Sequence, residues 1–299
     1  MTPNTAELLA NNPRPELDEI DVFGMTDKGL VRKVNADHFV IASFHRAIHV
    51  HATSIEGDIG PTQTQNRGFT MIVADGVGGL PTAGEGSAEA VKVMVQHLLH
   101  ATELTSTLVL LDEAEAIEQV RNAVLSAHSQ LVQKGQAEGR KPATTITMFM
   151  GFWPRVFIAN AGDSRYYRLR QGRLERFTVD QTMAEVMVEQ GALTREKAES
   201  SRLKHVLWSA VGNDEMRPDV RAIDIVRSDR HLLCTDGLTK HVSDEEIKER
   251  LSRVETSEHT VRALVGLAME RGGTDNITVI VCRTANAPPA HQAAPPASG

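Results

Sequence analysis

Cysteine is scarce in this chain of 299 residues: there are two, Cys234 and Cys282. Two cysteines exclude a disulfide framework and a cysteine-rich zinc site, and they fit a reducing compartment. Both lie in apolar runs that are typical of strands. We therefore interpret both as buried packing residues.

Long apolar segments are also missing. The longest runs, such as Ile277–Cys282, fall far short of the roughly 18 residues that a membrane-spanning helix needs. The sequence MTPNTAELLANNPRPELDEI at the start contains neither the basic nor the apolar stretch of a secretory signal. We therefore expect a cytoplasmic protein with no membrane partner.

The chain has no excess of basic charge. It contains 32 Lys and Arg residues against 39 Asp and Glu residues, which gives a formal net charge of -7. A protein that binds nucleic acid electrostatically needs a basic face to release counterions. We therefore expect no nucleic-acid partner, and we expect a monomer.

The composition changes at both ends of the chain. Residues 1–18 are polar and include Pro13 and Pro15, and we predict a flexible N-terminal arm. Residues 285–299 are rich in Ala and Pro, and we predict a disordered tail because they cannot bury enough apolar surface. Residues 19–284 are long enough, and apolar enough, to form one folded domain.

Short β-rich runs bounded by Gly, Asp or Asn predict strands, and longer amphipathic patterns predict helices. The predicted strands are His38–Ala42, Phe69–Ala74, Thr144–Met150, Val156–Asn160, Arg165–Leu169, Arg221–Val226, His231–Thr235 and Ile277–Cys282. The predicted helices are Ser87–His100, Asp112–Lys134, Gln181–Gln190, Asp244–Arg250 and Glu258–Arg271. Strands and helices do not alternate strictly, so we predict an α+β fold of packed sheets with helices outside.

Several aspartates stand at the ends of these predicted strands. They are Asp37, Asp75, Asp163, Asp236 and Asp275. Each taken alone is explained as a turn former or a helix cap. If the sheets bring them to one rim, however, so many carboxylates cannot all stay ionised without cations. Mg²⁺ and Mn²⁺ prefer such oxygen ligands, so the pattern predicts a binuclear metal site of the kind that activates water against a phosphate ester.

Five segments in order resemble the signature segments of a known family. TDKGLVRKVNAD, MIVADGVGG, NAGDSR, LLCTDGL and GGTDNITVIV are similar to those of the metal-dependent Ser/Thr protein phosphatases, the protein phosphatase 2C or PPM family, and most similar to its bacterial branch. The resemblance covers about residues 21–282. It implies a four-layer α-β-β-α sandwich, in which two antiparallel sheets are flanked by helices and a metal cleft lies at one end.

The resemblance also implies ligands for two Mg²⁺ or Mn²⁺ ions. Asp75 would bridge the two ions, and Asp236 and Asp275 would complete the shell of one of them. The carbonyl of Gly76 would bind the second ion, where the lack of a Cβ allows close approach. Asp37 would act on that ion mainly through its waters.

Two further residues receive roles from the resemblance. Asp163 matches the residue that, together with Asp236, holds a third and weaker metal in bacterial members. Arg32 matches the arginine that binds the substrate phosphate, a task that suits its planar, permanently charged group.

The implied activity is hydrolysis of phosphoserine and phosphothreonine in proteins, by direct attack of a metal-bridging water, in opposition to a Ser/Thr kinase. A cysteine-based mechanism is excluded, since the segment after Cys234 lacks the arginine of a Cys-x₅-Arg loop. A second hypothesis stays open: a metal-binding regulatory pseudophosphatase that binds a partner without turnover. Ala36 favours it, because the family usually has Glu or Gln there and the change removes a polar contact near the second metal.

Two segments have no readable chemistry of their own. Residues 170–212 match the variable flap that lies beside the metal cleft in the family; within them we predict a helix capped by Gly191 and a new helical turn starting at Thr194. Residues 43–67 are longer than the family usually allows, and we predict an extended hairpin or loop without an assigned role.

Overall fold

The computed structural model describes most of the predicted domain. The arm up to residue 11 and the tail predicted over 285–299 lie outside the described residues, as does most of the long segment 43–67. The described residues are 12–44, 48–54, 68–78, 83–104 and 113–284. Among them, no helix is both long and apolar enough to cross a membrane.

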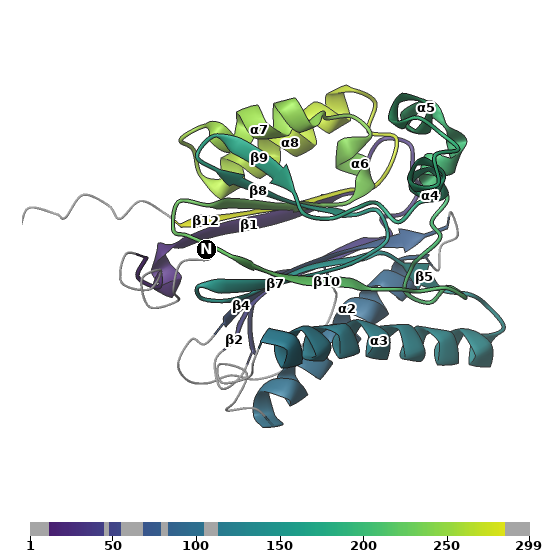
Figure 1. The fold of residues 1–299 in the computed structure, drawn as a ribbon, viewed down its shortest axis with the longest axis horizontal. Coiled ribbons are helices and arrows are strands. Elements are labelled where there is room, and N and C mark those ends of the chain that lie inside the picture. Colours follow the sequence, from purple (N-terminus) through teal and green to yellow (C-terminus); the bar gives the residue numbers. More distant parts are fainter. Residues whose placement is uncertain (1–11, 45–47, 55–67, 79–82, 105–112, 285–299) are drawn as a thin grey trace, which may run out of the picture.

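Two antiparallel sheets lie face to face, with helices on both outer faces (Figure 1). The first sheet has the order β1 (Ile20–Asp27), β12 (Ile277–Thr284), β11 (Arg230–Cys234), β8 (Arg165–Arg170) and β9 (Arg173–Arg176). The second has the order β10 (Asp219–Asp224), β7 (Arg155–Ala161), β6 (Ile146–Phe152), β4 (Gly68–Val77), β2 (Asp37–Phe44) and β3 (Ile48–Thr53), with β5 (Ala143–Thr144) paired to β4. The predicted α+β sandwich of four layers is confirmed.

The helices divide between the two outer faces. The long α2 (Ala83–Leu104) and α3 (Glu113–Glu138) cover the second sheet, and α6 (Asp236–Thr239), α7 (Asp244–Ser252) and α8 (Ser257–Glu270) cover the first (Figure 1). A third group lies at one end of the sandwich: α4 (Met183–Glu189), α5 (Arg195–Ser200) and the 3₁₀ turn η2 (Arg202–His205). A 3₁₀ turn, η1 (Leu17–Glu19), directly precedes β1.

Three apolar layers hold these elements together: one under each helical layer and one between the sheets. Members of the three layers include Met94, Leu131 and Met148; Leu232, Leu264 and Val279; and Phe39, Met71 and Ile280. A side chain of this size contributes roughly 1.5–3 kcal/mol when it is fully buried. The ends of the strands are therefore carried by a rigid frame.

The start of the described chain is attached to this frame by Asn12, which is buried. Its Nδ2 donates to the carbonyl of Ile225 at 3.0 Å, and its own carbonyl accepts from the indole N–H of Trp153 at 2.8 Å. Its Oδ1 accepts from the backbone N–H of Arg227 at 3.0 Å. Of the arm predicted over residues 1–18, the part from Asn12 onward is thus bound to the domain.

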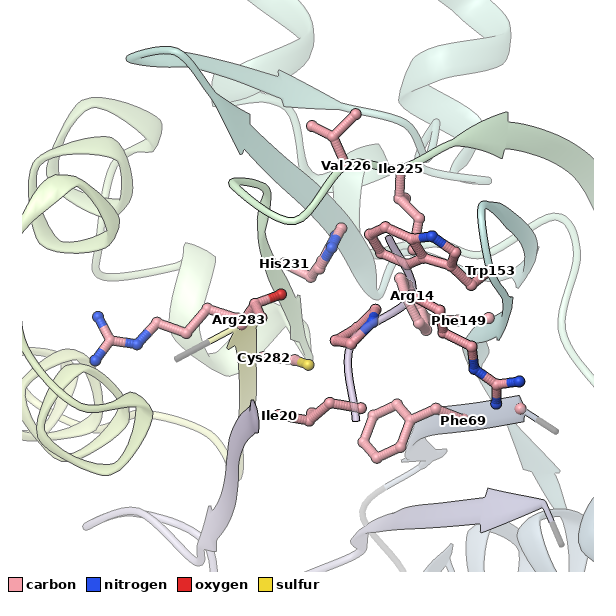
Figure 2. Close-up of a pocket in the computed structure, with 14 residues that line it drawn as sticks. Arg14, Ile20, Phe69, Phe149, Trp153, Ile225, Val226, His231, Cys282 and Arg283 are labelled. Carbon is pink, nitrogen blue, oxygen red and sulfur yellow. The ribbon is translucent and has the colours of Figure 1, made fainter. Parts of the chain in front are cut away.

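An apolar cavity of about 70 Å³ lies between the sheets near this attachment. Figure 2 shows Phe69, Phe149, Trp153 and Cys282 around it, together with the ring of His231. The imidazole of His231 is buried, its Nδ1 lies 2.9 Å from the hydroxyl of Tyr166, and its ring centroid is 4.9 Å from that of Phe149. Burial disfavours the imidazolium and lowers the pKa of His231 to about 4.

This buried histidine makes the fold sensitive to acid. The unfolded chain takes up a proton at His231 below about pH 6.5, whereas the folded chain does so only near pH 4. As the pH is lowered between these values, the free energy of unfolding decreases, by up to about 1.4 kcal/mol per pH unit. Glutamine does not titrate, so His231→Gln should lack this acid-dependent loss of stability. In urea unfolding, we expect the free energy of unfolding to decrease less in the variant than in the wild type when the pH is lowered from 7 to 5.

His259→Gln provides the control for that measurement, because its side chain is 67% exposed. Its Nε2 lies 3.5 Å from Glu255 Oε2 in an exposed pair that contributes only about 0.3–0.5 kcal/mol, so its difference from the wild type is expected to change by no more than that over the same range. A difference between His231→Gln and the wild type that stays constant with pH would contradict the argument.

Candidate active site

The aspartates predicted to bind metal lie at one end of the sandwich, the end at which α6 is found (Figure 1). Asp37 is the first residue of β2 and stands directly opposite Asp75 of β4 in the antiparallel pair. Asp236 is the first residue of α6, Asp275 immediately precedes the loop residue before β12, and Asp163 follows β7. Two strands of the first sheet, β11 and β12, and three of the second, β2, β4 and β7, thus bring carboxylates to the same end.

A cavity of about 1170 Å³ opens at this end. Its lining includes the predicted site residues Arg32, Asp75, Gly76, Asp163, Asp236 and Asp275. Asp37 does not line it; its side chain is buried next to Asp75. The structure therefore brings six of the predicted residues to one cavity and places the seventh behind it.

Two threonine hydroxyl groups donate hydrogen bonds to the carboxylate of Asp37. Its Oδ2 accepts hydrogen bonds from Thr235 Oγ1 and Thr278 Oγ1, each at 2.8 Å. Its Oδ1 is buried and has no hydrogen-bond partner within the described residues. Burial raises the pKa of Asp37 to about 7, an effect that the two hydroxyls partly oppose.

Asp75 and Asp163 carry the strongest penalty for negative charge. Burial raises the pKa of both carboxyls well above the ordinary value, and the nearby Asp236 adds to the rise in each case. Asp236 itself has a buried Oδ1 without a partner in the described part of the chain. The Oδ1 atoms of Asp37 and Asp236 therefore lack, among the residues that the structure describes, a partner that would offset their burial.

Two cations offset the charge at the other side of the cluster. Arg32 approaches Asp275 with two groups, Nε at 2.7 Å from Oδ1 and Nη2 at 2.8 Å from Oδ2. Lys240 Nζ lies 2.6 Å from Oδ2 of Asp275 and 2.6 Å from Oδ2 of Asp236. Although burial acts to raise it, these contacts bring the pKa of Asp275 below its ordinary value.

The donor set fits a hard divalent cation. It consists of carboxylate oxygens, two of them buried without partners, in a setting where uncompensated negative charge is costly. Within the ranges that the structure describes, no three acidic, imidazole or thiol side chains already converge on one point. Asp236 and Asp275 are instead engaged by Lys240, so a metal ion would require these side chains to reorient.

The side chain of Asn276, just before β12, is hydrogen-bonded to the backbone of the loop that contains Arg32. Its Oδ1 accepts from the backbone N–H of Ala36 at 2.8 Å, and its Nδ2 donates to the carbonyls of Lys28 and Val34 at 2.8 and 3.0 Å. The carbonyl of Ala36 in turn accepts from the N–H of Gly76 at 3.2 Å. Ala36 therefore contributes its backbone to the site.

Gly237 allows α6 to approach this loop closely. A Cβ at Gly237 would lie 1.8 Å from the carbonyl oxygen of Asn276, a backbone atom that cannot move aside cheaply. The glycine after Asp236 is thus required for packing: it sets the distance between the two segments that supply Asp236 and Asp275.

The predicted flap forms a wall of the same cavity. Residues 204–207, at the end of η2 and beyond it, line the cavity together with Arg32. Gly191 has φ +70°, as expected of a left-handed helix cap, and the hydroxyl of Thr194 accepts from the N–H of Lys197 as the N-cap of α5. Both local predictions are confirmed.

Sequence reasoning missed several residues that contact the aspartates. Lys240 could have been found, because it stands four positions after Asp236, a spacing that places two side chains on one helical face. Thr235 and Thr278 are visible only as strand residues, and their contact with Asp37 depends on how the two sheets face each other.

Comparisons with known proteins agree with this geometry. The family model described as "Protein phosphatase 2C" matches residues 49–270. Serine/threonine protein phosphatase PstP of Mycobacterium tuberculosis is 35% identical over 211 residues, which cover 71% of this chain and 39% of PstP. This chain therefore spans well under half the length of that relative. Serine/threonine phosphatase stp of Listeria innocua is 30% identical, with 76% of this chain and 88% of that protein covered.

Solved structures show the same fold. A crystal structure of PstP/Ppp from Mycobacterium tuberculosis superposes with a TM-score of 0.69 and 27% identity, covering 89% of this chain and 99% of that chain. The catalytic domain of PstP, solved in complex with two manganese ions, gives a TM-score of 0.66 and 26% identity over the same shares of the two chains.

Gly237→Ala tests the close approach of α6. We expect the added methyl group to displace α6, to lower the free energy of unfolding by about 1–3 kcal/mol and to weaken Mn²⁺ binding by about tenfold or more. Urea unfolding and calorimetric titration with Mn²⁺ measure the two effects.

Gly266→Ala is the matched control, because a Cβ there meets nothing within 4 Å. It should stabilise α8 slightly and leave Mn²⁺ affinity unchanged. Wild-type Mn²⁺ affinity in Gly237→Ala would show that the contact does not position Asp236.

Proposed function

The chain belongs to the protein phosphatase 2C family, and on this premise we propose that it hydrolyses phosphoserine and phosphothreonine in proteins with the aid of Mg²⁺ or Mn²⁺. The observation that carries the proposal is the gathering of acidic strand ends around one cavity that also has Arg32 on its rim. Carboxylates with raised pKa values supply the oxygen donors, and the arginine supplies a phosphate-binding group.

Each predicted site residue has a place in this proposal. Asp75 would bridge two metal ions, Asp236 and Asp275 would bind the first, and the carbonyl of Gly76 would bind the second, with Asp37 acting through water. When bound, the ions lower the pKa of water so that it can attack phosphorus, and they stabilise charge on the phosphoryl oxygens.

The remaining residues position these ligands and the substrate. Thr235 and Thr278 fix the rotamer of Asp37 by holding its Oδ2. Asp163 would hold a third, weaker ion together with Asp236. Arg32, whose side chain is 44% exposed, can turn from Asp275 toward a phosphate at the mouth of the cavity.

The rim of the cavity favours a protein substrate over a small phosphate ester. Four exposed valines line it: Val31, Val34, Val77 and Val206. They come from three separate segments: the Arg32 loop, the end of β4 and the flap. Apolar side chains next to a phosphorylated residue can pack on them, which gives residues 170–212 a part in substrate choice.

The proposal extends to the cellular compartment, the oligomeric state and the opposing enzyme. We place the protein in the cytoplasm, as a monomer that opposes a Ser/Thr kinase. Its two cysteines are free and buried, which suits a reducing compartment.

Hydrolysis of a phosphothreonine peptide and of p-nitrophenyl phosphate in millimolar Mn²⁺ tests the proposal. We expect turnover by the wild type that a chelator abolishes. Asp236→Asn should lose this turnover and bind Mn²⁺ at least about tenfold more weakly, because a metal ligand contributes at least as much as the groups behind it. Its circular dichroism should match that of the wild type.

Asp18→Asn, an exposed aspartate far from the cavity in η1, is the matched control and should behave as the wild type. Full activity of Asp236→Asn would remove Asp236 from the site. Mn²⁺ binding by the wild type without any turnover would favour the regulatory pseudophosphatase instead.

A further inference from the structure

Lys240 lies at the centre of the metal-binding carboxylates and has no part in the mechanism above. It is the C-cap of α6, and its N–H donates to the carbonyl of Asp236 at 2.8 Å. This single turn places its side chain on the same face as that of Asp236. The side chain is 24% exposed and reaches into the cavity, not out to solvent.

The ammonium group of Lys240 joins two carboxylates that come from different segments. Its Nζ lies 2.6 Å from Oδ2 of Asp236 and 2.6 Å from Oδ2 of Asp275. Arg32 also binds Asp275, but it does so from the rim. In the part of the chain that the structure describes, Lys240 is the one cation that contacts both aspartates.

A divalent ion and this ammonium compete for the same oxygens. Mg²⁺ binds carboxylate oxygens at about 2.0–2.1 Å, closer than the hydrogen-bond distance of an ammonium group. Two cations on the same pair of oxygens would repel each other strongly. Lys240 must therefore move before a metal ion binds Asp236 and Asp275 together.

We propose that Lys240 is a built-in cation that holds Asp236 and Asp275 together in the metal-free protein and is displaced when a divalent ion binds. The inference rests on the proposed function, because that function assigns these two aspartates to the metal. It makes Lys240 a positioning residue with two opposite effects: it stabilises the metal-free protein and weakens the affinity for metal.

Lys240→Met tests both effects, because methionine keeps most of the side-chain length without the charge. We expect the variant to bind Mn²⁺ about tenfold or more tightly in calorimetric titration, since the ion no longer displaces an ammonium group. In a chelator it should melt at a lower temperature than the wild type, and saturating Mn²⁺ should remove that deficit.

Lys204→Met is the matched control. Lys204 lines the same cavity, but its Nζ donates to the carbonyl of Glu199 at 2.7 Å and not to the aspartates. If net charge in the cavity were the cause, this variant would show the same gain in Mn²⁺ affinity. We expect its affinity to match that of the wild type.

A measurement on the wild type keeps the proposal testable if Lys240→Met does not fold without metal. Acylation of lysine side chains, followed by mass spectrometry, should modify Lys240 slowly in a chelator and faster in Mn²⁺, while Lys204 is modified equally in both. Unchanged or slower modification of Lys240 in Mn²⁺ would overturn the proposal. So would unchanged or weaker Mn²⁺ binding by Lys240→Met.

The outcomes also separate this inference from the proposed function. Mn²⁺-dependent turnover by the wild type, with equal Mn²⁺ affinity in Lys240→Met, would leave the function standing and reject the role of Lys240. Absence of Mn²⁺ binding in both proteins would reject both. Binding by Lys240→Met alone would support the role of Lys240 even if the wild type shows no turnover.

Discussion

Mutual repulsion among buried carboxylates is the constraint on which this end of the molecule depends. Strand pairing sets Asp37 directly against Asp75, and the close approach of α6 to the start of β12 brings Asp236 near Asp275. None of these groups can relieve the repulsion by moving apart, because three apolar layers hold the strands in place. Relief has to come from protons, from hydroxyl groups or from cations, and the structure shows the last two in place around Asp37 and Asp275.

The strands that carry the aspartates also build the opposite end of the molecule. β4 begins near Phe69 and continues to Asp75, and β12 runs from the residues after Asp275 to Cys282. The cavity beside His231 is thus made by the far ends of the same strands (Figure 2). One end is apolar and lies near the Asn12 attachment, while the other is acidic. Because each strand runs from an apolar end to an acidic end, the candidate metal ligands lie at one end of the sandwich only.

Much of the fold and the composition of the site could be predicted from the sequence, because the signals are local. An apolar run that ends in an aspartate predicts both a strand and the position of a carboxylate at its end. All the predicted strands exist, whereas β1 and β9 were missed and β3 lies in the segment predicted only as an extended hairpin or loop. All three are edge strands, and β1 is only half buried along its whole length. The depth of Asp37 and the contact of Lys240 with Asp275 could not be predicted, since they depend on how distant segments pack.

The distance along the chain between the parts of this cluster has a consequence for folding. Asp37 and Thr278 are in hydrogen-bond contact although 241 positions separate them. The cluster therefore does not exist until both sheets have docked, and the unfolded chain offers no equivalent site. A ligand that binds only the folded chain shifts the folding equilibrium toward it in proportion to its concentration. The supply of divalent ions in the cell would thus set how much of the protein survives as folded chain, in addition to how fast it works.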